Sequence, residues 1–187
     1  MRAMKCMPSI HRAALAGAVL LLHTLVAPAA QSASLRVTSS SFVDGGMIPP
    51  GFTCDGANQS PDLQIAAPPA GTRSFAIVAN DPDAPTAFIH WLAYNLPAAT
   101  RVVPAGASTP SVRLAHALEG INGFGHVGYG GPCPPQGGAH HYVFRVFALD
   151  ANLALPAGAT AEQVNGAMQG HVLAQGQITG LYARGGG

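Results

Sequence analysis

Glycine and proline divide the chain into short apolar runs, and their frequency limits the folds that the chain can adopt. The sequence contains 23 Gly and 16 Pro among its 187 residues. The runs between them are rich in β-branched and aromatic residues, which is typical of strands. Four runs are predicted as strands, at residues 73–79, 88–95, 141–149 and 177–182. Their nearly continuous apolar character predicts burial on both faces, as in the middle of a sandwich.

One segment near the C-terminus predicts a helix instead. Thr160 is expected to cap its first turn, and Gln163, three residues later, completes the pattern of a capping box. Gly176 is expected to end the helix. The residues that recur at helical spacing are Val164, Ala167, Met168, His171 and Val172.

Residues 1–33 have the pattern of a secretory signal peptide. Basic residues precede an apolar run at 13–26, and small residues follow that run. The run covers 14 positions and contains His23, whereas a membrane-spanning helix needs about 20 apolar residues. We therefore expect cleavage between residues 29 and 34, a single domain over residues 34–187, and a periplasmic or secreted location without a transmembrane span.

Cleavage would also change the charge of the protein. Three of the 9 basic residues, Arg2, Lys5 and Arg12, would leave with the leader, so that 6 remain against 8 acidic residues, a net charge near −2. No lysine would remain. A protein that binds a polyanion gains affinity by placing a basic face against it. We therefore expect neither nucleic acid nor an anionic membrane surface as a partner, and any anion site must be built from a few local donors.

Two cysteines, Cys54 and Cys133, follow the predicted leader. In an oxidising compartment such a pair favours a disulfide. Closing a loop of this length would stabilise the fold by about 4 kcal/mol in the chain-entropy model. We favour the bridge, and two buried free thiols are the alternative, because a sequence does not show whether the two Cα atoms come close together.

Polar residues that could carry chemistry lie at the ends of two predicted strands. Asp81 and Asp83 flank Pro82 directly after the first strand, and the proline makes this a stiff turn. Their carboxylates could instead do no more than cap local amides. His90 lies in the next strand, where alternation places it on the face opposite Trp91. A histidine in a strand is also often a purely structural residue.

A glycine-rich segment, residues 118–139, contains eight glycines and leads into the third strand. Glycines allow a backbone to approach a ligand, and successive amides can bind an anion, but prolines remove donors and the lysine of a phosphate-binding P-loop is absent. Because the neighbouring His140 and His141 point to opposite faces of a strand, no metal site is expected. A cysteine nucleophile would require Cys133 to be free and paired with His140. Catalytic residues and cofactors are therefore not expected.

Taken together and in this order, the segments resemble the phosphatidylethanolamine-binding protein family, and more closely its bacterial Raf-kinase-inhibitor-like branch. The resemblance covers essentially the whole chain after the predicted leader. Its main motifs are DPDAP at 81–85, HWLAYNLP at 90–97, and GPCPPQG at 131–137 followed by His140 and Tyr142. Further similarity lies in FTCDG at 52–56, in Ser60-Pro61 and in residues 170–182.

The resemblance implies a mostly β fold of two antiparallel sheets, with a few peripheral helices and one of these near the C-terminus. It also implies a small surface pocket for phosphate-like anions, in which Asp81 would orient His90 or meet an ammonium group such as ethanolamine. Histidines and loop amides can donate to phosphate oxygens. The ligand-binding residues that it implies are Asp81, Asp83, His90, Gly131, Pro132, Cys133, Pro134, His140 and Tyr142.

Two functions are compatible with such a pocket. The first is non-enzymatic binding of a small phosphate-like anion or a phospholipid head group, with an affinity that depends on pH because histidines line the site. The alternative is an interaction with a protein partner, in which the same pocket inhibits a protease or a kinase. The sequence identifies neither the natural ligand nor the biological process.

Overall fold

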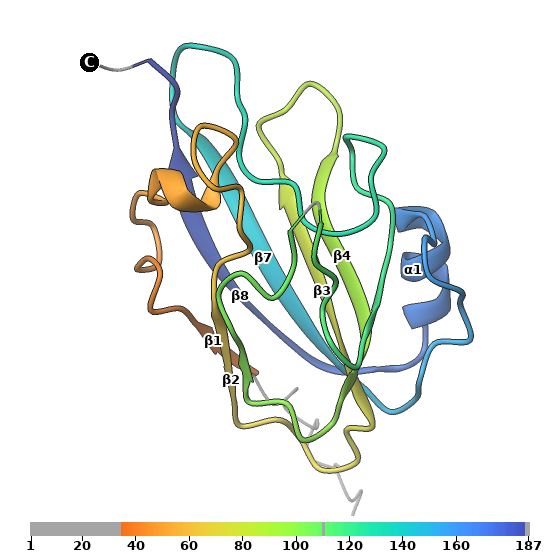
Figure 1. Cartoon of the computed structure of the whole chain (residues 1–187). Coiled ribbons are helices and arrows are strands. Elements are labelled where there is room, and N and C mark those ends of the chain that lie inside the picture. Colours follow the sequence, from red (N-terminus) through yellow and green to blue (C-terminus); the bar gives the residue numbers. More distant parts are fainter. Residues whose placement is uncertain (1–34, 110, 186–187) are drawn as a thin grey trace, which may run out of the picture. The chain divides into compact units, whose positions relative to one another are not determined.

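The computed structural model describes residues 35–109 and 111–185, so the predicted signal peptide at residues 1–33 lies outside the described part. Figure 1 shows the order of the elements along the chain. They are β1 (Arg36–Thr38), the 3-10 helix η1 (Pro50–Phe52), β2 (Leu63–Ala66), β3 (Ser74–Asp81), β4 (Phe88–Pro97), β5 (Val102–Val103), β6 (Leu118–Glu119), β7 (His140–Leu149), α1 (Ala161–Met168) and β8 (Val172–Tyr182).

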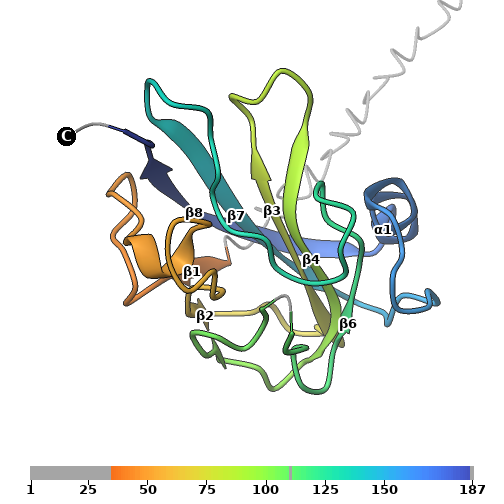
Figure 2. The ribbon, with the colours of Figure 1, turned by 45° about the horizontal axis from the view of Figure 1, so that its top comes forward.

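The strands form two antiparallel sheets. The larger has the order β6-β4-β3-β7-β8 and the smaller the order β1-β2-β5. Figure 2 shows the short strands β1 and β2 lying across one face of the larger sheet, with α1 on its other side. This confirms the mostly β fold of two antiparallel sheets with a helix near the C-terminus.

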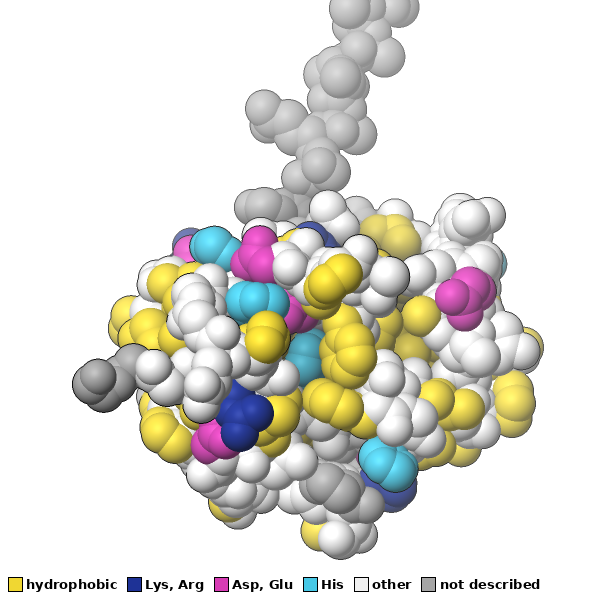
Figure 3. Space-filling view, turned by 90° about the horizontal axis from the view of Figure 1, so that it is seen from above, with side chains coloured by type: hydrophobic (Ala, Val, Ile, Leu, Met, Phe, Trp, Pro, Cys, Tyr) yellow, Lys and Arg dark blue, Asp and Glu magenta, His cyan; other side chains and the backbone are white. Residues whose placement is uncertain are grey.

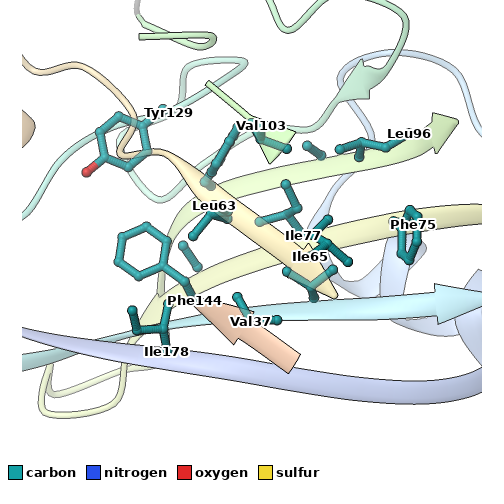
Figure 4. Packing of buried hydrophobic residues seen from close by; sticks show 14 of the residues in the cluster. Val37, Leu63, Ile65, Phe75, Ile77, Leu96, Val103, Tyr129, Phe144 and Ile178 are labelled. Atoms are coloured by element: carbon teal, nitrogen blue, oxygen red, sulfur yellow. The ribbon is translucent and has the colours of Figure 1, made fainter. Parts of the chain in front are cut away.

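Alternation along β3 explains why its sequence is apolar at nearly every position. Phe75 and Ile77 pack into a core between the two sheets, together with Leu63 of β2 and Phe144 of β7 (Figure 4). The intervening residues, among them Val78, pack into a second core that is covered by α1. Because both faces of β3 are covered, the predicted burial on both faces is confirmed for this strand.

The predicted helix is shorter than its apolar spacing suggested. The capping box at Thr160 and Gln163 is present, but α1 ends at Met168, and Gly170, with a φ of 79°, turns the chain into β8. The expected end at Gly176 is therefore wrong. That glycine lies inside β8, where a Cβ atom would collide with the carbonyl of Leu35. No helix in the described ranges combines the length and the apolar character that crossing a membrane requires.

A β-bulge in β4 changes the direction of one predicted site residue. Ala79 of β3 pairs with Trp91, and the next residue, Asn80, pairs with Ile89, so His90 is an extra residue without a partner in this register. Its ring lies 5.1 Å from that of Tyr142, which belongs to the core between the sheets. The predicted placement of His90 opposite Trp91 is therefore wrong, because the bulge interrupts the alternation on which it relied.

The two cysteines form a disulfide. The Cα atoms of Cys54 and Cys133 lie 5.4 Å apart, and the bond joins the segment after η1 to the glycine-rich segment before β7. The favoured bridge is confirmed, and the alternative of two free thiols is wrong. Next to it, the amide of Cys54 donates to the carbonyl of Pro132 at 3.1 Å, so the two segments are also joined by a backbone hydrogen bond.

Candidate functional site

A cavity of about 360 Å³ opens where β3 ends and where β4 and β7 begin. In the space-filling view, histidine, acidic and hydrophobic side chains gather around a hollow on this end of the molecule (Figure 3). Residues that are far apart in the sequence meet here, because the ends of three neighbouring strands of the larger sheet lie side by side. The lining residues are Asp81, Asp83, Ala84, Pro85, Phe88, His90, Phe124, Cys133, Pro134, Pro135, His140 and Tyr142.

Most of the residues implied by the family resemblance line this cavity. The exceptions are Gly131 and Pro132. Gly131 lines a neighbouring cavity, and its amide donates to Oδ1 of Asn58 at 2.7 Å. The carbonyl of Pro132 accepts the bond from Cys54. The expected backbone wall from Gly131 to Pro134 therefore contributes only Cys133 and Pro134 to the lining.

Asp81 anchors both the turn after β3 and a histidine of β7. Its Oδ1 accepts from the amides of Asp83 at 2.8 Å and Ala84 at 3.1 Å, so it does cap its own turn. Its Oδ2 lies 2.8 Å from Nδ1 of His140. The expectation that Asp81 orients His90 is wrong, because its free oxygen is directed at β7 and fixes His140 instead.

His90 is held by the backbone of the glycine-rich segment. Its Nδ1 donates to the carbonyl of Gly130 at 2.7 Å, and only 4% of the residue is exposed. The rings of Phe88 and Phe124 lie 4.9 Å and 5.6 Å from the imidazole. Burial lowers the pKa of His90 below its usual 6.5, so the ring is neutral at pH 7. The other nitrogen, Nε2, has no hydrogen-bond partner among the described residues.

The hydroxyl of Tyr142 is buried without a partner. The residue is 1% exposed, and its oxygen makes no hydrogen bond within the described part of the chain. Burial, the nearby negative charge of Asp81 and an interaction of the hydroxyl with that carboxylate, at a distance too long to count as a hydrogen bond, raise the pKa of Tyr142, so the phenol keeps its hydrogen. A buried polar group without a partner is rare in folded proteins, and here it belongs to a residue that lines the cavity.

Asp83 forms the exposed edge of the site. Its Oδ2 accepts from both the amide and Nδ1 of His141, each at 2.7 Å. These bonds, the amide first, lower the pKa of Asp83. This carboxylate therefore ties the turn after β3 to the start of β7, next to the bond between Asp81 and His140.

Aromatic side chains form a part of the lining that the sequence motifs did not indicate. Phe88 and Phe124 stack edge to face, with ring centroids 4.8 Å apart and planes inclined at 72°. Phe124 carried a weak signal, as one of only two aromatic residues in the glycine-rich segment at 118–139. Ala84, Pro85 and Pro135 also line the cavity without having been selected.

The chemistry of the lining is that of a binding site built from a few polar atoms. Cys133 is bridged and offers no thiol as a nucleophile. Within residues 35–109 and 111–185, no three His, Cys, Asp or Glu side chains are grouped as metal ligands would be. Among the described residues, the side-chain atoms of the lining without a protein partner are the buried hydroxyl of Tyr142, Nε2 of His90 and His140, and Oδ1 of Asp83.

Comparison with known proteins agrees with the motifs. The family model described as phosphatidylethanolamine-binding protein matches residues 38–183. A UPF0098 protein of Aquifex aeolicus is 46% identical to this chain, over 83% of this chain and 92% of the length of the Aquifex protein. The UPF0098 protein YbcL of Escherichia coli is 36% identical, over 82% and 90%.

Solved structures show the same likeness. The crystal structure of YbcL from Escherichia coli has a TM-score of 0.76 at 33% identity and covers 82% of this chain and 100% of that chain. A phosphatidylethanolamine-binding protein homologue from Chlamydia trachomatis has a TM-score of 0.74 at 34% identity and covers 81% and 99%. The chain therefore belongs to the phosphatidylethanolamine-binding protein family.

Proposed function

We propose that this protein binds small phosphate-like anions or phosphorylated head groups in the cavity at the ends of β3, β4 and β7, without catalysing a reaction. The unpaired hydroxyl of Tyr142 carries the proposal. Leaving a buried hydroxyl without a partner costs about 1–3 kcal/mol. A ligand oxygen in the cavity would remove that cost, and His140 and His90 lie on the same lining to contact other atoms of the ligand.

His140 makes the proposed binding dependent on pH. His140 is already bonded to the carboxylate of Asp81, so a proton on its Nε2 would provide a cationic donor for an anion beside a fixed counter-charge. The described residues of the lining include neither Lys nor Arg. Affinity for an anion should therefore fall as the pH rises and the imidazolium form is lost.

Calorimetric titration of the purified protein with inorganic phosphate and with phosphoethanolamine tests this function. In an anion-poor buffer we expect saturable binding at about pH 6 and weaker binding at about pH 8. The His90→Ala variant should remain folded and lose binding. His171→Ala is the matched control, because this histidine is exposed, pairs with Asp150 and is absent from the cavity lining. Absence of heat with either ligand would contradict the proposal.

We also propose that the protein is exported. The pattern of residues 1–33 and the disulfide between Cys54 and Cys133 support this, because disulfides persist mainly in oxidising compartments. Fractionation of cells that produce the full chain, followed by intact-mass measurement, should find a form that begins between residues 30 and 34 outside the cytoplasm. Recovery of only the uncleaved chain in the cytoplasm would contradict export.

A further inference from the structure

The hydrogen-bond partners behind His90 fix what this residue can offer to a ligand. A carbonyl oxygen only accepts, so the 2.7 Å bond to Gly130 requires the hydrogen of the neutral ring to be on Nδ1. The Nε2 atom then carries a lone pair and no hydrogen. With the ring held neutral by its surroundings, His90 presents an acceptor to the cavity.

His140 is constrained in the same way. The carboxylate of Asp81 accepts from its Nδ1, so the neutral ring of His140 also has a bare Nε2. Tyr142 supplies the single unpaired O–H group. Until His140 takes up a proton, the side-chain atoms of the lining without a protein partner are therefore acceptors, at Nε2 of both histidines and Oδ1 of Asp83, and only Tyr142 can donate.

Negative charge near His90 comes from the end of β3 and the turn after it. Asp81 ends β3 and Asp83 lies in that turn, while His140 and Tyr142 come from β7 and the neighbours Phe88 and Phe124 are uncharged. The two carboxylates act alike on anions of equal charge, so Nε2 of His90 is the atom that can distinguish them. An anion whose oxygens all lack hydrogen would set lone pairs against this nitrogen, whereas an anion with an O–H group would donate to it.

Building on the proposed function, we propose that the cavity selects oxyanions that carry their own hydrogen, with Nε2 of His90 accepting the O–H group of the ligand. The ligand class is then hydrogen phosphate and singly protonated phosphate monoesters. Sulfate, which has the same tetrahedral shape but no hydrogen near neutral pH, is expected to bind more weakly. His90 is thus the residue that determines specificity, and Tyr142 and His140 hold the remaining oxygens.

Phosphate and sulfate form a matched pair of probes. At about pH 8 inorganic phosphate is mostly a dianion, like sulfate, and the two differ by a single hydrogen. Calorimetric titration of the purified protein with each salt at about pH 8 should show at least about tenfold tighter binding of phosphate, the ratio expected when one hydrogen bond is replaced by opposed lone pairs. Methyl phosphate, which loses its last hydrogen near pH 6, should bind far more weakly at about pH 8 than inorganic phosphate does.

Variants separate the role of His90 from general damage to the site. A glutamine at position 90 has an amide that can donate, so His90→Gln should narrow the ratio between phosphate and sulfate. Tyr142→Phe removes the O–H group and should weaken both anions without changing their ratio, and His171→Gln should change neither. The wild-type comparison stands even if His90→Gln fails to fold.

The outcomes distinguish this inference from the function on which it rests. Binding of phosphate without sulfate supports both. Binding of the two anions within about threefold of each other would overturn the selection by His90 and leave the anion-binding function in place. If neither anion binds, the proposed function fails, and the inference fails with it.

Discussion

Two histidine–aspartate pairs in this molecule have the same bond length and very different surroundings. Nδ1 lies 2.8 Å from a carboxylate oxygen both in the pair His140–Asp81, at the cavity, and in the pair His171–Asp150. In the second pair, Asp150 directly follows β7 and His171 directly precedes β8. The side chains are 19% and 6% exposed in the first pair and 47% each in the second. Only Asp81 also binds two backbone amides. A short distance therefore does not distinguish the pair at the cavity from the exposed pair, whereas burial together with backbone anchoring does.

The largest expected difference between the pairs is in stability. Asp81→Ala should lower the free energy of unfolding by about 3 kcal/mol, because it leaves two amides and His140 without a buried acceptor. Asp150→Ala should cost less than about 0.5 kcal/mol, as is usual for an exposed pair. Urea unfolding measures both. Asp81→Asn keeps an acceptor oxygen, so it should lower the free energy of unfolding by less than Asp81→Ala does. Equal decreases for Asp81→Ala and Asp150→Ala would contradict the expected difference between the two pairs.

Affinity should separate the same two histidines. His140→Ala removes the group that can become a cationic donor, and we expect about tenfold weaker binding of inorganic phosphate at about pH 6. His171→Ala should bind phosphate like the wild type. Calorimetry at this pH provides the measurement, with thermal unfolding of each variant to show that it is folded. A loss of binding in His171→Ala would mean that the exposed pair acts on the cavity.

His90 sharpens the comparison, because it is buried but bonded to a carbonyl and not to a carboxylate. Burial lowers the pKa of His90 below 6.5, so folding favours the neutral ring. Its contribution to stability is present above pH 6.5, the value for the unfolded chain, and is lost as the pH falls through the lower pKa of the folded state. Urea midpoints at about pH 5 and pH 7.5 should therefore differ more in the wild type than in His90→Gln. The same difference in both proteins would show that other groups cause the change.

The third pair, His141–Asp83, is exposed and should show the smallest effect. The pKa of Asp83 lies below the usual 3.8 chiefly because the amide of His141 donates to it, and the imidazole adds to this. His141→Ala keeps the amide, so the pKa of Asp83 should rise only part of the way to 3.8. Titration followed by NMR measures it. A complete return to 3.8 would assign the whole shift to the ring.

The main strands could be predicted because each is a local apolar run. The disulfide could be predicted because only two cysteines follow the predicted leader. The run at 73–79 is apolar and lies between turn residues, and the structure places β3 at Ser74–Asp81. The strands β1, β2, β5 and β6 were not predicted, because runs of two to four residues are too short to show a period. The predicted end of the helix failed for a different reason: the need for a glycine at position 176 comes from the carbonyl of Leu35, far away in the sequence.

The candidate site could also be predicted only where the signal lies within a short stretch of sequence, and not where it depends on the pairing of distant strands. The motifs selected most of the polar lining, but alternation placed His90 on the wrong face, because a bulge depends on the spacing of two strands and not on one. The partner of Asp81 was also missed. Two histidines were available, and only the pairing of β3 with β7 decides that His140 is the one within reach.

Because Cys133 lines the cavity, the position of one cavity wall depends on a covalent bond as well as on folding. That wall is attached to Cys54, 79 residues earlier, through sulfur atoms. Two samples of identical sequence, one produced in a reducing cytoplasm and one in an oxidising compartment, can therefore have different walls around the cavity. The two forms differ in mass by two hydrogen atoms, so an intact-mass measurement shows which form of the cavity a sample contains before any titration begins.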